Sequence, residues 1–461
     1  MIYGNLLSKG PQKPPVKVGI IGAGNFGTAI ITQSPVIPQY TVTCVADMNI
    51  ESARKACRLA GWDEGHFAVA DKDADVREAR CRGKVVLMAR PELMSACDVE
   101  VVVEATGQAE AGAVHAVAAF AQGCHVVMVN KETDAAVGPI LHRKAERAGV
   151  VYTQADGDQP AAIIGLCDWA RVLGLEVIAA GKSHDKEIVL DERAGEVRIG
   201  EKTLPIQPTW VEAARPIRDD AAAKIAARRR CFGETGANYD RMEMICVANA
   251  TGLDPITGPH AEPILRTLEI PEALCLKTDG GTLDRPGMLD TVCSLITPEI
   301  PTMGGGVFVV VHCENAYSRA ILHTKGLVPN RAGTAAVIYR PYHLCGVETP
   351  ISIITAARLG VPTGARETRP RWDLIAVAKR DLTRGTAIDR NLELTDQLTS
   401  RYESWARTHQ EKLLPLTLCA GLRLTQDVVA GTPLTEAMVE IPQDSFLWGL
   451  RREQEEVFGK K

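Results

Sequence analysis

The sequence lacks any run of about 20 apolar residues, the length that a helix needs to cross a bilayer. It also lacks an excess of basic residues, since its formal net charge is −5. This balance gives no basic footprint for nucleic acid or an anionic membrane surface. Residues 1–15 have no apolar stretch of the signal-peptide kind. We therefore expect a cytoplasmic homo-oligomer whose partner is a small-molecule substrate, with no nucleic acid and no membrane.

Several motifs of other protein classes are missing as well. The 13 cysteines include no CxxC pair, so we expect buried, reduced thiols instead of a cysteine metal site. There is no GxSxG, no HExxH and no P-loop, which removes support for hydrolase, zinc-protease and kinase functions. The length of 461 residues exceeds the usual size of one domain and predicts two or three.

A glycine turn follows the first apolar stretch of the chain. Residues 18–21 run into a GxGxxG pattern made by Gly22, Gly24 and Gly27. The first glycine allows the tight bend, the second lets the backbone approach a pyrophosphate, and the third lets the following helix pack closely. We expect a dinucleotide to contact the turn residues Gly22, Ala23, Gly24, Asn25, Phe26 and Gly27.

A second apolar stretch, residues 41–46, ends in Asp47. An acid at this position accepts hydrogen bonds from the adenosine ribose hydroxyls and would repel a 2′-phosphate. Asp47 therefore favours NAD over NADP, although Arg54 in the next helix could offset part of the repulsion. The alternative is an ordinary glycine-rich turn with a surface aspartate.

Strand and helix patterns alternate from residue 16 to about 155, which predicts a parallel sheet with crossover helices. We expect further strands at 84–88, 99–105 and 125–129, and a helix at 50–60. Ligands bind beyond the carboxyl ends of such strands. Residues that follow two of the strands should therefore join the glycine turn in the cofactor site: Thr106, Gly107, Asn130 and Lys131.

Beyond residue 155 the pattern changes to mixed strands and helices with many loops. We expect strands at 175–181, 186–190 and 306–313 and one helix over 210–230. The predicted fold class is α/β, with an N-terminal Rossmann domain, an α+β substrate domain and a small β-rich C-terminal domain. Their expected limits are 16–155, 156–365 and 370–445, with 332–360 a candidate for returning to the first domain.

The C-terminal part contains an internal repeat, because residues 380–388 match residues 426–434. The shared positions are Asp381, Gly385 and Thr386, which recur as Asp427, Gly431 and Thr432. Two copies are too few for a solenoid, so the repeat predicts a compact module of paired motifs. Chance similarity is the alternative, since Asp-x-x-x-Gly-Thr is common turn chemistry.

Residues 103–107 (VEATG) and 129–132 (VNKE) resemble the nucleotide-binding domain of homoserine dehydrogenases. Residues 154–160, 304–311 and 339–344 resemble homoserine-dehydrogenase-like proteins with a C-terminal SAF domain. That group includes the 1-deoxy-D-xylulose-5-phosphate reductoisomerase-like proteins. The repeat fits an SAF-like domain at 370–445, so the resemblance spans nearly the whole chain.

The resemblance implies an NAD(P)H-dependent oxidoreductase that acts on a small, phosphorylated keto-sugar. In the best-known branch the reaction is reductive isomerisation of 1-deoxy-D-xylulose 5-phosphate to 2-C-methyl-D-erythritol 4-phosphate, in isoprenoid biosynthesis. Fold alone does not fix a substrate. A homoserine or sugar-acid dehydrogenase without isomerisation is the second hypothesis, and a nucleotide-sensing binding module is the third. Reductoisomerases of the usual kind require a metal, so a divalent metal is a candidate cofactor whose ligands stay unassigned.

Hydride transfer to a carbonyl develops negative charge on oxygen, which a cationic or acidic donor must stabilise. Lys182, after an apolar strand, is the first catalytic candidate, and Lys325, beside a glycine, is another. Asp156 and Asp158 flank a glycine at a strand-to-helix junction. We expect Asp156 in catalysis and Asp158 in substrate binding, with helix capping as the alternative.

Two further residues are candidates for substrate binding. Arg285 is the strong anion donor of a glycine-rich loop, and His343 lies in a Tyr-Arg-Pro-Tyr-His segment. Each has a structural alternative, an ordinary turn and a packed histidine. Asp220 and Lys224 have the spacing of an aspartate and lysine pair in homoserine dehydrogenases, but we favour a solvated helix face for them.

Overall fold

The computed structural model describes residues 14–218, 220–300 and 302–459. The chain divides into two compact units. The first comprises residues 1–161, 344–398 and 405–461, and the second comprises 162–343 and 399–404. Most of the expected N-terminal lead-in, residues 1–13, lies outside the described residues. No described helix combines the length and the apolar character needed to cross a membrane.

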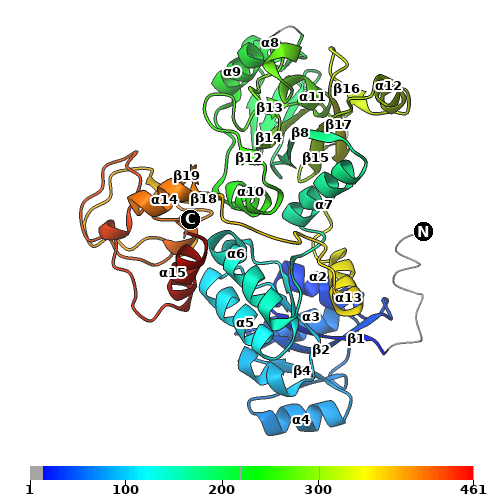
Figure 1. Cartoon of the computed structure of the whole chain (residues 1–461), viewed down its shortest axis with the longest axis vertical. Helices are drawn as coiled ribbons and strands as arrows, with labels where there is room; N and C mark the ends of the chain where they lie inside the picture. Colours follow the sequence, from blue (N-terminus) through cyan, green and yellow to red (C-terminus); the bar gives the residue numbers. More distant parts are fainter. Residues whose placement is uncertain (1–13, 219, 301, 460–461) are drawn as a thin grey trace. The chain divides into compact units, whose positions relative to one another are not determined.

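The first unit contains a seven-stranded sheet in the order β3-β4-β2-β1-β5-β6-β7 (Figure 1). All its pairings are parallel, which confirms the predicted α/β class. The strands are β1 (Val16–Ile21), β2 (Tyr40–Ala46), β3 (Phe67–Val69), β4 (Val85–Met88), β5 (Val101–Glu104), β6 (His125–Met128) and β7 (Tyr152–Gln154).

Helices cover both faces of this sheet, so β1 and β5 are almost continuously apolar. Val18, Ile20, Val101 and Val103 are fully buried. The helices are α2 (Asn25–Gln33), α3 (Ile50–Leu59), α4 (Asp73–Cys81), η1 (Pro91–Ala96), α5 (Ala109–Ala121), α6 (Lys131–Ala148) and α13 (Thr349–Leu359). The last of them, within the expected return at 332–360, packs on β1 and β6.

The second unit is built on a mixed ten-stranded sheet, in the order β11-β10-β9-β14-β8-β15-β17-β16, with β12 and β13 also paired to β14. At its centre β8 runs parallel to β14 and antiparallel to β15. The strands are β8 (Glu176–Ser183), β9 (Ile188–Asp191), β10 (Glu196–Ile199), β11 (Lys202–Pro205), β12 (Asp254–Pro255), β13 (Ile264–Leu265), β14 (Met288–Ile296), β15 (Val307–His312), β16 (Val328–Pro329) and β17 (Ala336–Arg340).

The prediction of one helix over residues 210–230 is wrong, because the segment forms two helices. Arg215 is extended, with φ of −57° and ψ of 146°, since it precedes Pro216, and the residue before a proline disfavours the helical region. The helices of this unit are α7 (Gln159–Val172, which starts in the first unit), α8 (Pro208–Ala214), α9 (Ala221–Phe232), α10 (Asn238–Thr251), η2 (Thr267–Glu269), α11 (Ile270–Ala273), η3 (Lys277–Asp279) and α12 (Ala316–Thr324).

The two copies of the internal repeat, residues 380–388 and 426–434, are bonded to each other. Backbone bonds of 2.8 Å join Leu382 and Val428 in both directions. The two repeated aspartates act reciprocally: Asp381 accepts from the Ala430 N–H at 2.8 Å, and Asp427 accepts from the Arg384 N–H at 2.6 Å. The two copies are thus halves of one symmetric pairing.

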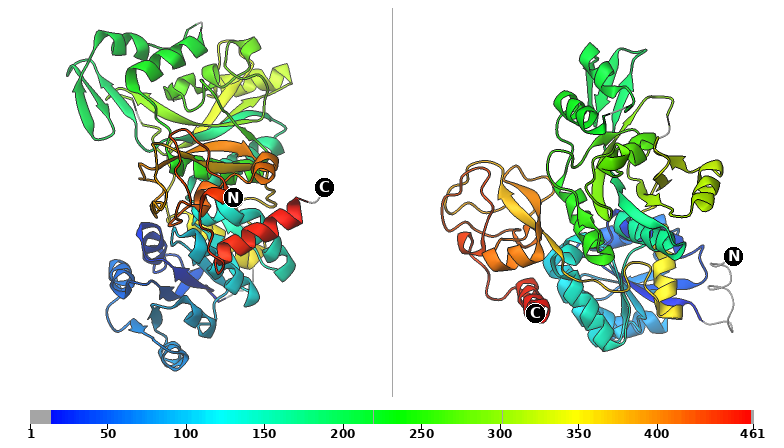
Figure 2. Two further views of the ribbon diagram at one scale, coloured as in Figure 1. Left: turned by 90° about the vertical axis from the view of Figure 1, so that its left-hand side faces the viewer. Right: turned by 45° about the horizontal axis from the view of Figure 1, so that its top comes forward.

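The rest of this segment contains few regular elements. Its last helix, α15, packs on α5 and α6 (Figure 2). Glu110 at the start of α5 accepts hydrogen bonds from the Ser445 hydroxyl at 2.6 Å and the Phe446 N–H at 2.7 Å. The elements are β18 (Trp372–Ala378), β19 (Leu398–Ser404), α14 (Trp405–Glu411), η4 (Leu416–Leu418), η5 (Glu436–Met438) and α15 (Phe446–Phe458).

Candidate active site

In the glycine turn between β1 and α2, two of the three glycines have no room for a side chain, and the third lies beside open space. Gly22 has a φ of 98°, and a Cβ there would lie 2.5 Å from the Ala105 carbonyl oxygen. A Cβ on Gly27 would collide with the carbonyl oxygen of Gly22. A Cβ on Gly24 would meet no atom within 4 Å. The space beside Gly24 is therefore free for a ligand.

Helix α2 begins beside this open space, and no side chain caps its N-terminus. Its first N–H groups have no intrahelical partner and carry the positive end of the helix dipole, which together favour an anion. Among the neighbouring residues, Ala23 is buried, Phe26 is half-buried and Asn25 is exposed. The turn therefore fits the pyrophosphate of a dinucleotide.

Asp47 follows β2 and braces the glycine turn. Its Oδ2 atom accepts a hydrogen bond from the Ala23 N–H at 2.8 Å, and its Oδ1 atom accepts one from the Asn49 N–H at 2.8 Å. Arg54, the candidate for offsetting this charge, is paired with Glu51 at 3.2 Å and with Glu64 at 2.8 Å. Arg54 is thus engaged by two glutamates instead of by Asp47.

The segments after β5 and β6 are tied to each other. The Asn130 amide donates to the Thr106 hydroxyl at 3.2 Å, and that hydroxyl donates at 2.6 Å to Glu104, a fully buried acid that sequence reasoning missed. Gly107 has a φ of 64°, and Lys131 is the first residue of α6. Because β2, β1, β5 and β6 are adjacent parallel strands, all the predicted cofactor residues lie along one edge of the sheet.

The second unit holds a buried cluster of charged side chains around Lys182. Its ammonium Nζ lies 2.6 Å from Asp240 Oδ1 and forms a second ion pair with Glu243 Oε2. The two acids are three residues apart on α10, a spacing that puts both on the same side of the helix. Lys182 and Asp240 are fully buried, and Glu243 is nearly so.

His184 and Tyr239 extend this cluster from the buried lysine toward solvent. His184 Nε2 lies 3.3 Å from Asp240 Oδ2, while Nδ1 accepts a hydrogen bond from the Lys186 N–H at 2.9 Å. Because Nδ1 accepts from the Lys186 N–H, the proton of the neutral ring is assigned to Nε2. The Tyr239 hydroxyl lies 3.2 Å from each ring nitrogen, and Lys182 Nζ lies 5.6 Å from the centre of the tyrosine ring. Tyr239 is half-buried, whereas Lys182, Asp240, Glu243 and His184 are buried.

Burial and charge shift the pKa values of the cluster in different directions. Burial lowers the pKa of Lys182, but the attraction of Glu243 and Asp240 outweighs it and leaves that pKa above its usual value. Burial raises the pKa of Asp240, and Lys182 opposes the rise only in part because one ammonium faces two carboxylates. Burial also lowers the pKa of His184, against the attraction of Asp240. The lysine is thus charged and the histidine neutral at neutral pH.

A cavity of about 560 Å³ borders the cluster at His184. This volume is within the roughly 300–1,000 Å³ typical of small-molecule sites. The cavity lies beside the β9–β11 strands and the loop that leads into α10. Charged side chains of both signs line it together with His184: Lys186, Glu187, Glu201, Lys202 and Glu234. It therefore suits a polar small molecule.

His343 belongs to the same end of the sheet as Lys182. Its Nδ1 atom lies 2.7 Å from the Gly305 carbonyl oxygen. The Gly305 N–H donates to the His184 carbonyl at 3.3 Å, and the Ser183 N–H donates to the Gly306 carbonyl at 2.7 Å. The glycine loop before β15 thus joins His343 to the strand that carries the cluster.

The structure does not bring Lys325 or Arg285 to this cluster. Lys182 lies on the end of β8 that pairs with Val307, the first residue of β15. Lys325 is exposed and follows α12, which comes after the opposite end of β15 (Figure 1). Arg285 precedes β14, whose start pairs with an earlier part of β8, and it pairs with Asp254 at 2.6 Å. A role in catalysis for Lys325 and in substrate binding for Arg285 stays a prediction.

Asp156 and Asp158 lie in the first unit, at the junction of β7 and α7. The Asp156 backbone N–H donates to the Ser352 hydroxyl at 2.8 Å, and its carbonyl accepts from the Thr349 hydroxyl at 2.7 Å. Asp158 Oδ1 accepts from the Gln159 N–H at 2.9 Å, at the start of α7. These contacts fix α13 and begin α7, and a role in binding substrate stays a prediction for both.

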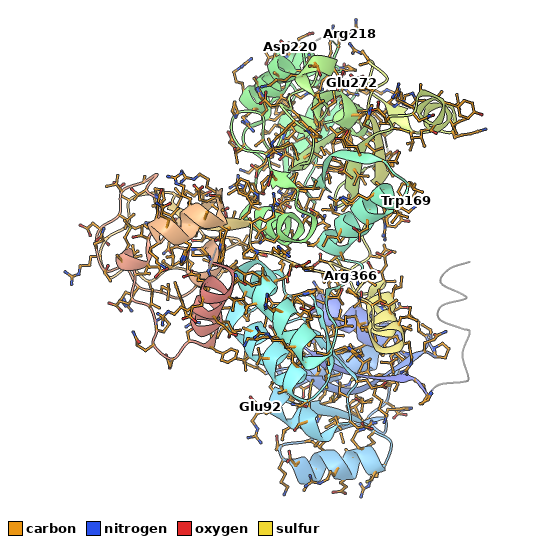
Figure 3. All side chains as sticks on the ribbon, viewed as in Figure 1. Glu92, Trp169, Arg218, Asp220, Glu272 and Arg366 are labelled. Carbon is orange, nitrogen blue, oxygen red and sulfur yellow. The ribbon has the colours of Figure 1, made fainter. Side chains whose placement is uncertain are left out.

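Asp220 and Lys224 have structural partners at the start of α9. Asp220 caps this helix by accepting the Ala223 N–H at 2.9 Å, and Lys224 donates to the Glu212 carbonyl at 3.2 Å. Asp220 lies near Arg218 at the periphery of its unit (Figure 3). The arrangement is that of a solvated helix end.

The residues that the structure describes offer no ready metal site. Within them, no three His, Cys, Asp or Glu side chains gather in a way that could hold an ion. The strongest carboxylate pair, Asp240 and Glu243, is already neutralised by the Lys182 ammonium. This donor set does not fit a divalent cation while the lysine stays in place.

Sequence reasoning found Lys182 but missed its partners Asp240, Glu243, His184 and Tyr239. The segment Asn238-Tyr239-Asp240-Arg241-Met242-Glu243 carried a usable signal. Two acids three residues apart lead directly into an apolar run, residues 244–248, which predicts a buried helix. Acids on a buried helix require a cation, and Lys182 at the end of an apolar strand is one.

Family models match two parts of the chain. Residues 22–154 match the homoserine dehydrogenase NAD binding domain, and residues 157–349 match the catalytic domain of oxidoreductase DRL. The two matches together support an NAD(P)-dependent oxidoreductase. No curated protein matches the chain.

Solved structures of oxidoreductases show limited likeness. The 1-deoxy-D-xylulose 5-phosphate reductoisomerase from Zymomonas mobilis in complex with NADPH is 17% identical, with a TM-score of 0.30 over 51% of this chain and 58% of that one. A probable dehydrogenase from Thermotoga maritima is 12% identical, with a TM-score of 0.36 over 77% and 91%. The putative oxidoreductase yvaA from Bacillus subtilis is 14% identical, with a TM-score of 0.35 over 78% and 92%. Likeness at this level carries no argument about substrate.

Proposed function

We propose that the protein transfers a hydride between a nicotinamide nucleotide and the carbonyl carbon of a small polar substrate, with Tyr239 as the proton donor. One observation carries the proposal: contacts run without a break from the buried Lys182 ammonium through Asp240 and His184 to the hydroxyl of Tyr239, a half-buried residue. The proton donor in such a reaction is a hydroxyl or imidazole within reach of the substrate oxygen, and its pKa is adjusted by neighbouring charges.

The residues in this series of contacts have separate tasks in the proposal. A bound nicotinamide would supply the hydride for reduction or accept it for oxidation. As negative charge develops on the carbonyl oxygen, the Tyr239 O–H donates a hydrogen bond to it and then the proton, which completes the alcohol. The phenolate that remains is stabilised by Lys182, 5.6 Å from the ring centre, and takes up its new proton from water, because Tyr239 is partly exposed to solvent. Asp240 places a carboxylate 3.3 Å from Nε2 of His184 and so favours the orientation in which the Nε2–H faces it.

We propose NAD as the preferred cofactor. The glycine turn and the uncapped N-terminus of α2 accept a pyrophosphate, and the charge of Asp47 disfavours a 2′-phosphate on the ribose. Neither feature depends on the identity of the substrate.

The substrate proposal is a small keto compound with an anionic group, such as a keto-sugar phosphate. Lys186 and Lys202 line the cavity next to His184 and offer the cations that a phosphate or carboxylate needs. Reductive isomerisation of 1-deoxy-D-xylulose 5-phosphate is the specific form of this proposal. One observation favours simple reduction instead: the buried carboxylates Asp240 and Glu243 are already paired with Lys182 and are not free to hold a metal ion.

The test is oxidation of NADH and NADPH with a set of carbonyl substrates that includes 1-deoxy-D-xylulose 5-phosphate and the aldehyde precursor of homoserine. We expect turnover with one substrate class, and a loss of kcat of about 10²–10⁴-fold in Tyr239→Phe. Tyr317→Phe is the matched control, because Tyr317 is exposed on α12. Full activity of Tyr239→Phe would refute the proton donor. Cofactor binding without turnover of any carbonyl would instead establish a nucleotide-sensing module.

A further inference from the structure

Six residues of the C-terminal segment, Thr399–Ser404, belong to the second unit, although the chain on both sides of them belongs to the first. They form most of β19. Within the second unit they lie against the start of α10, the helix that carries Asp240 and Glu243. The C-terminal segment thus reaches the helix that carries the acids of the charged cluster.

Two contacts fix the start of α10 to this segment. The Ser400 hydroxyl donates to Asn238 Oδ1 at 2.7 Å, and Arg241 Nη1 donates to the Ser400 carbonyl at 3.0 Å. Ser400 and Asn238 are both buried. Helix α10 has no side-chain cap of its own, so these bonds replace part of the usual anchoring of a helix N-terminus.

Arg241 continues the connection to the central sheet. Its guanidinium holds Glu262 in a two-point ion pair, with Nε to Oε1 at 2.5 Å and Nη2 to Oε2 at 2.7 Å. The Glu262 N–H in turn donates to Asp290 Oδ1 at 3.0 Å. Asp290 lies on β14 in register with Gly181, the residue before Lys182.

The local backbone is adapted to this ion pair. Glu262 has a φ of 52°, which is unfavourable for a residue with a side chain. A Cβ on Gly236 would collide with the carboxylate of Glu262 and with the Arg241 guanidinium. Strained backbone at a buried ion pair indicates that the position of the pair is specified by the surrounding structure.

We infer that the segment Thr399–Ser404 acts through Arg241 as a positioning device that sets α10, and with it Asp240, Glu243 and Tyr239, against Lys182. Arg241 directly follows Asp240 and is two residues from Tyr239, so a shift of its backbone displaces both. The C-terminal segment thereby contributes to the acid–base chemistry without touching the substrate. The kinetic part of this inference rests on the proposed function.

The experiment compares Arg241→Met with Arg266→Met. Arg266 is a matched control because it is also half-buried and also holds a backbone carbonyl, that of Ala214, at 2.9 Å. We expect Arg241→Met to lower kcat by up to about 100-fold with little change in KM, since small misplacements of reacting groups cost this much. Its pH–rate profile should shift, and Arg241→Lys should restore part of the rate.

A second measurement needs no substrate and separates this inference from the proposed function. NMR titration of His184 reports its contact with Asp240, and we expect a changed pKa in Arg241→Met and an unchanged one in Arg266→Met. Ser400→Ala removes the bond to Asn238 and the long contact of Arg241 Nη1 with the Ser400 hydroxyl, but keeps the bond of Arg241 to the Ser400 carbonyl. It should show a smaller change in the same direction, and it serves if Arg241→Met does not fold. An unaltered His184 titration in both Arg241→Met and Ser400→Ala would overturn the inference, whatever the protein reduces.

Discussion

Replacing Lys182 by methionine should destabilise the second unit in a way that depends on pH. The substitution keeps the length and apolar stem of the side chain but removes the ammonium that neutralises Asp240 and Glu243. Both acids are at most 2% exposed, so water cannot take over the role of the lysine. Removing one partner of a buried ion pair costs about 3–5 kcal/mol. At about 2–4 °C per kcal/mol for a unit of this size, the Tm should fall by roughly 10 °C.

The sign of the pH effect follows from the carboxylates. Burial already raises the pKa of Asp240, and loss of Lys182 raises it further. Between the unfolded pKa and this higher folded pKa the folded state binds more protons than the unfolded state, so the stability of Lys182→Met falls as pH rises. The wild-type protein loses the contribution of Lys182 only above the usual pKa of lysine, because its folded pKa is raised. The Tm difference between the two proteins should therefore be larger at pH 8 than at pH 5.

Calorimetry of the second unit's transition at the two pH values checks this prediction. The control is the triple variant Lys182→Met, Asp240→Asn, Glu243→Gln, in which no buried charge of the ion pair remains. Replacing a whole buried ion cluster by neutral groups is often close to neutral in stability, so the triple variant should regain most of the lost Tm. A Tm difference that ignores pH, or a triple variant as unstable as the single one, would refute the reasoning.

Two predictions concern the nucleotide-binding edge of the first unit. Gly24→Val should raise the Kd for dinucleotide at least about tenfold, or 1.4 kcal/mol. Its Tm should be retained, because the new side chain enters space that no described protein atom occupies. Gly22→Val should instead lower the Tm sharply, since the φ of 98° at Gly22 and the Ala105 carbonyl exclude a side chain. Calorimetric titration with thermal unfolding separates the two, and equal effects on both quantities would argue against a ligand beside Gly24. Asp47→Asn keeps an acceptor for the Ala23 N–H but removes the charge, so the ratio of NADH to NADPH affinity should fall about tenfold, a single-charge effect of order 1 kcal/mol; an unchanged ratio would show that Asp47 does not face the ribose.

The first unit could be predicted well because its signals are local. Continuous apolar strands, a glycine turn and an acid after β2 each follow from neighbouring residues, and the structure places Thr106 and Asn130 on the expected edge. The break at Pro216 is also a local signal, but the helical pattern on both sides of it concealed two short helices. The repeat at Asp381 and Asp427 was visible in the sequence, while the reciprocal bonding was not.

The candidate site of the second unit depends on pairings that sequence periodicity does not encode. Lys182 on β8 meets Asp240 only because α10, nearly 60 residues later in the chain, packs on β14, the neighbour of β8 in the sheet. Lys325 and Arg285 looked equivalent to Lys182 when judged by their glycine neighbours, yet the register of β8 with β14 and β15 separates them from it. Burial of a charge, not its flanking residues, distinguishes the three.

The most direct test of hydride transfer uses reduced nicotinamide nucleotide that carries deuterium at both hydrogen positions of C4, incubated with the protein and each carbonyl compound of the substrate set. Mass spectrometry of the products should show one deuterium on the former carbonyl carbon, at a rate that falls about 10²–10⁴-fold in Tyr239→Phe and stays unchanged in Tyr317→Phe. Product that forms without the label, or label transfer at the same rate in Tyr239→Phe, would contradict the account.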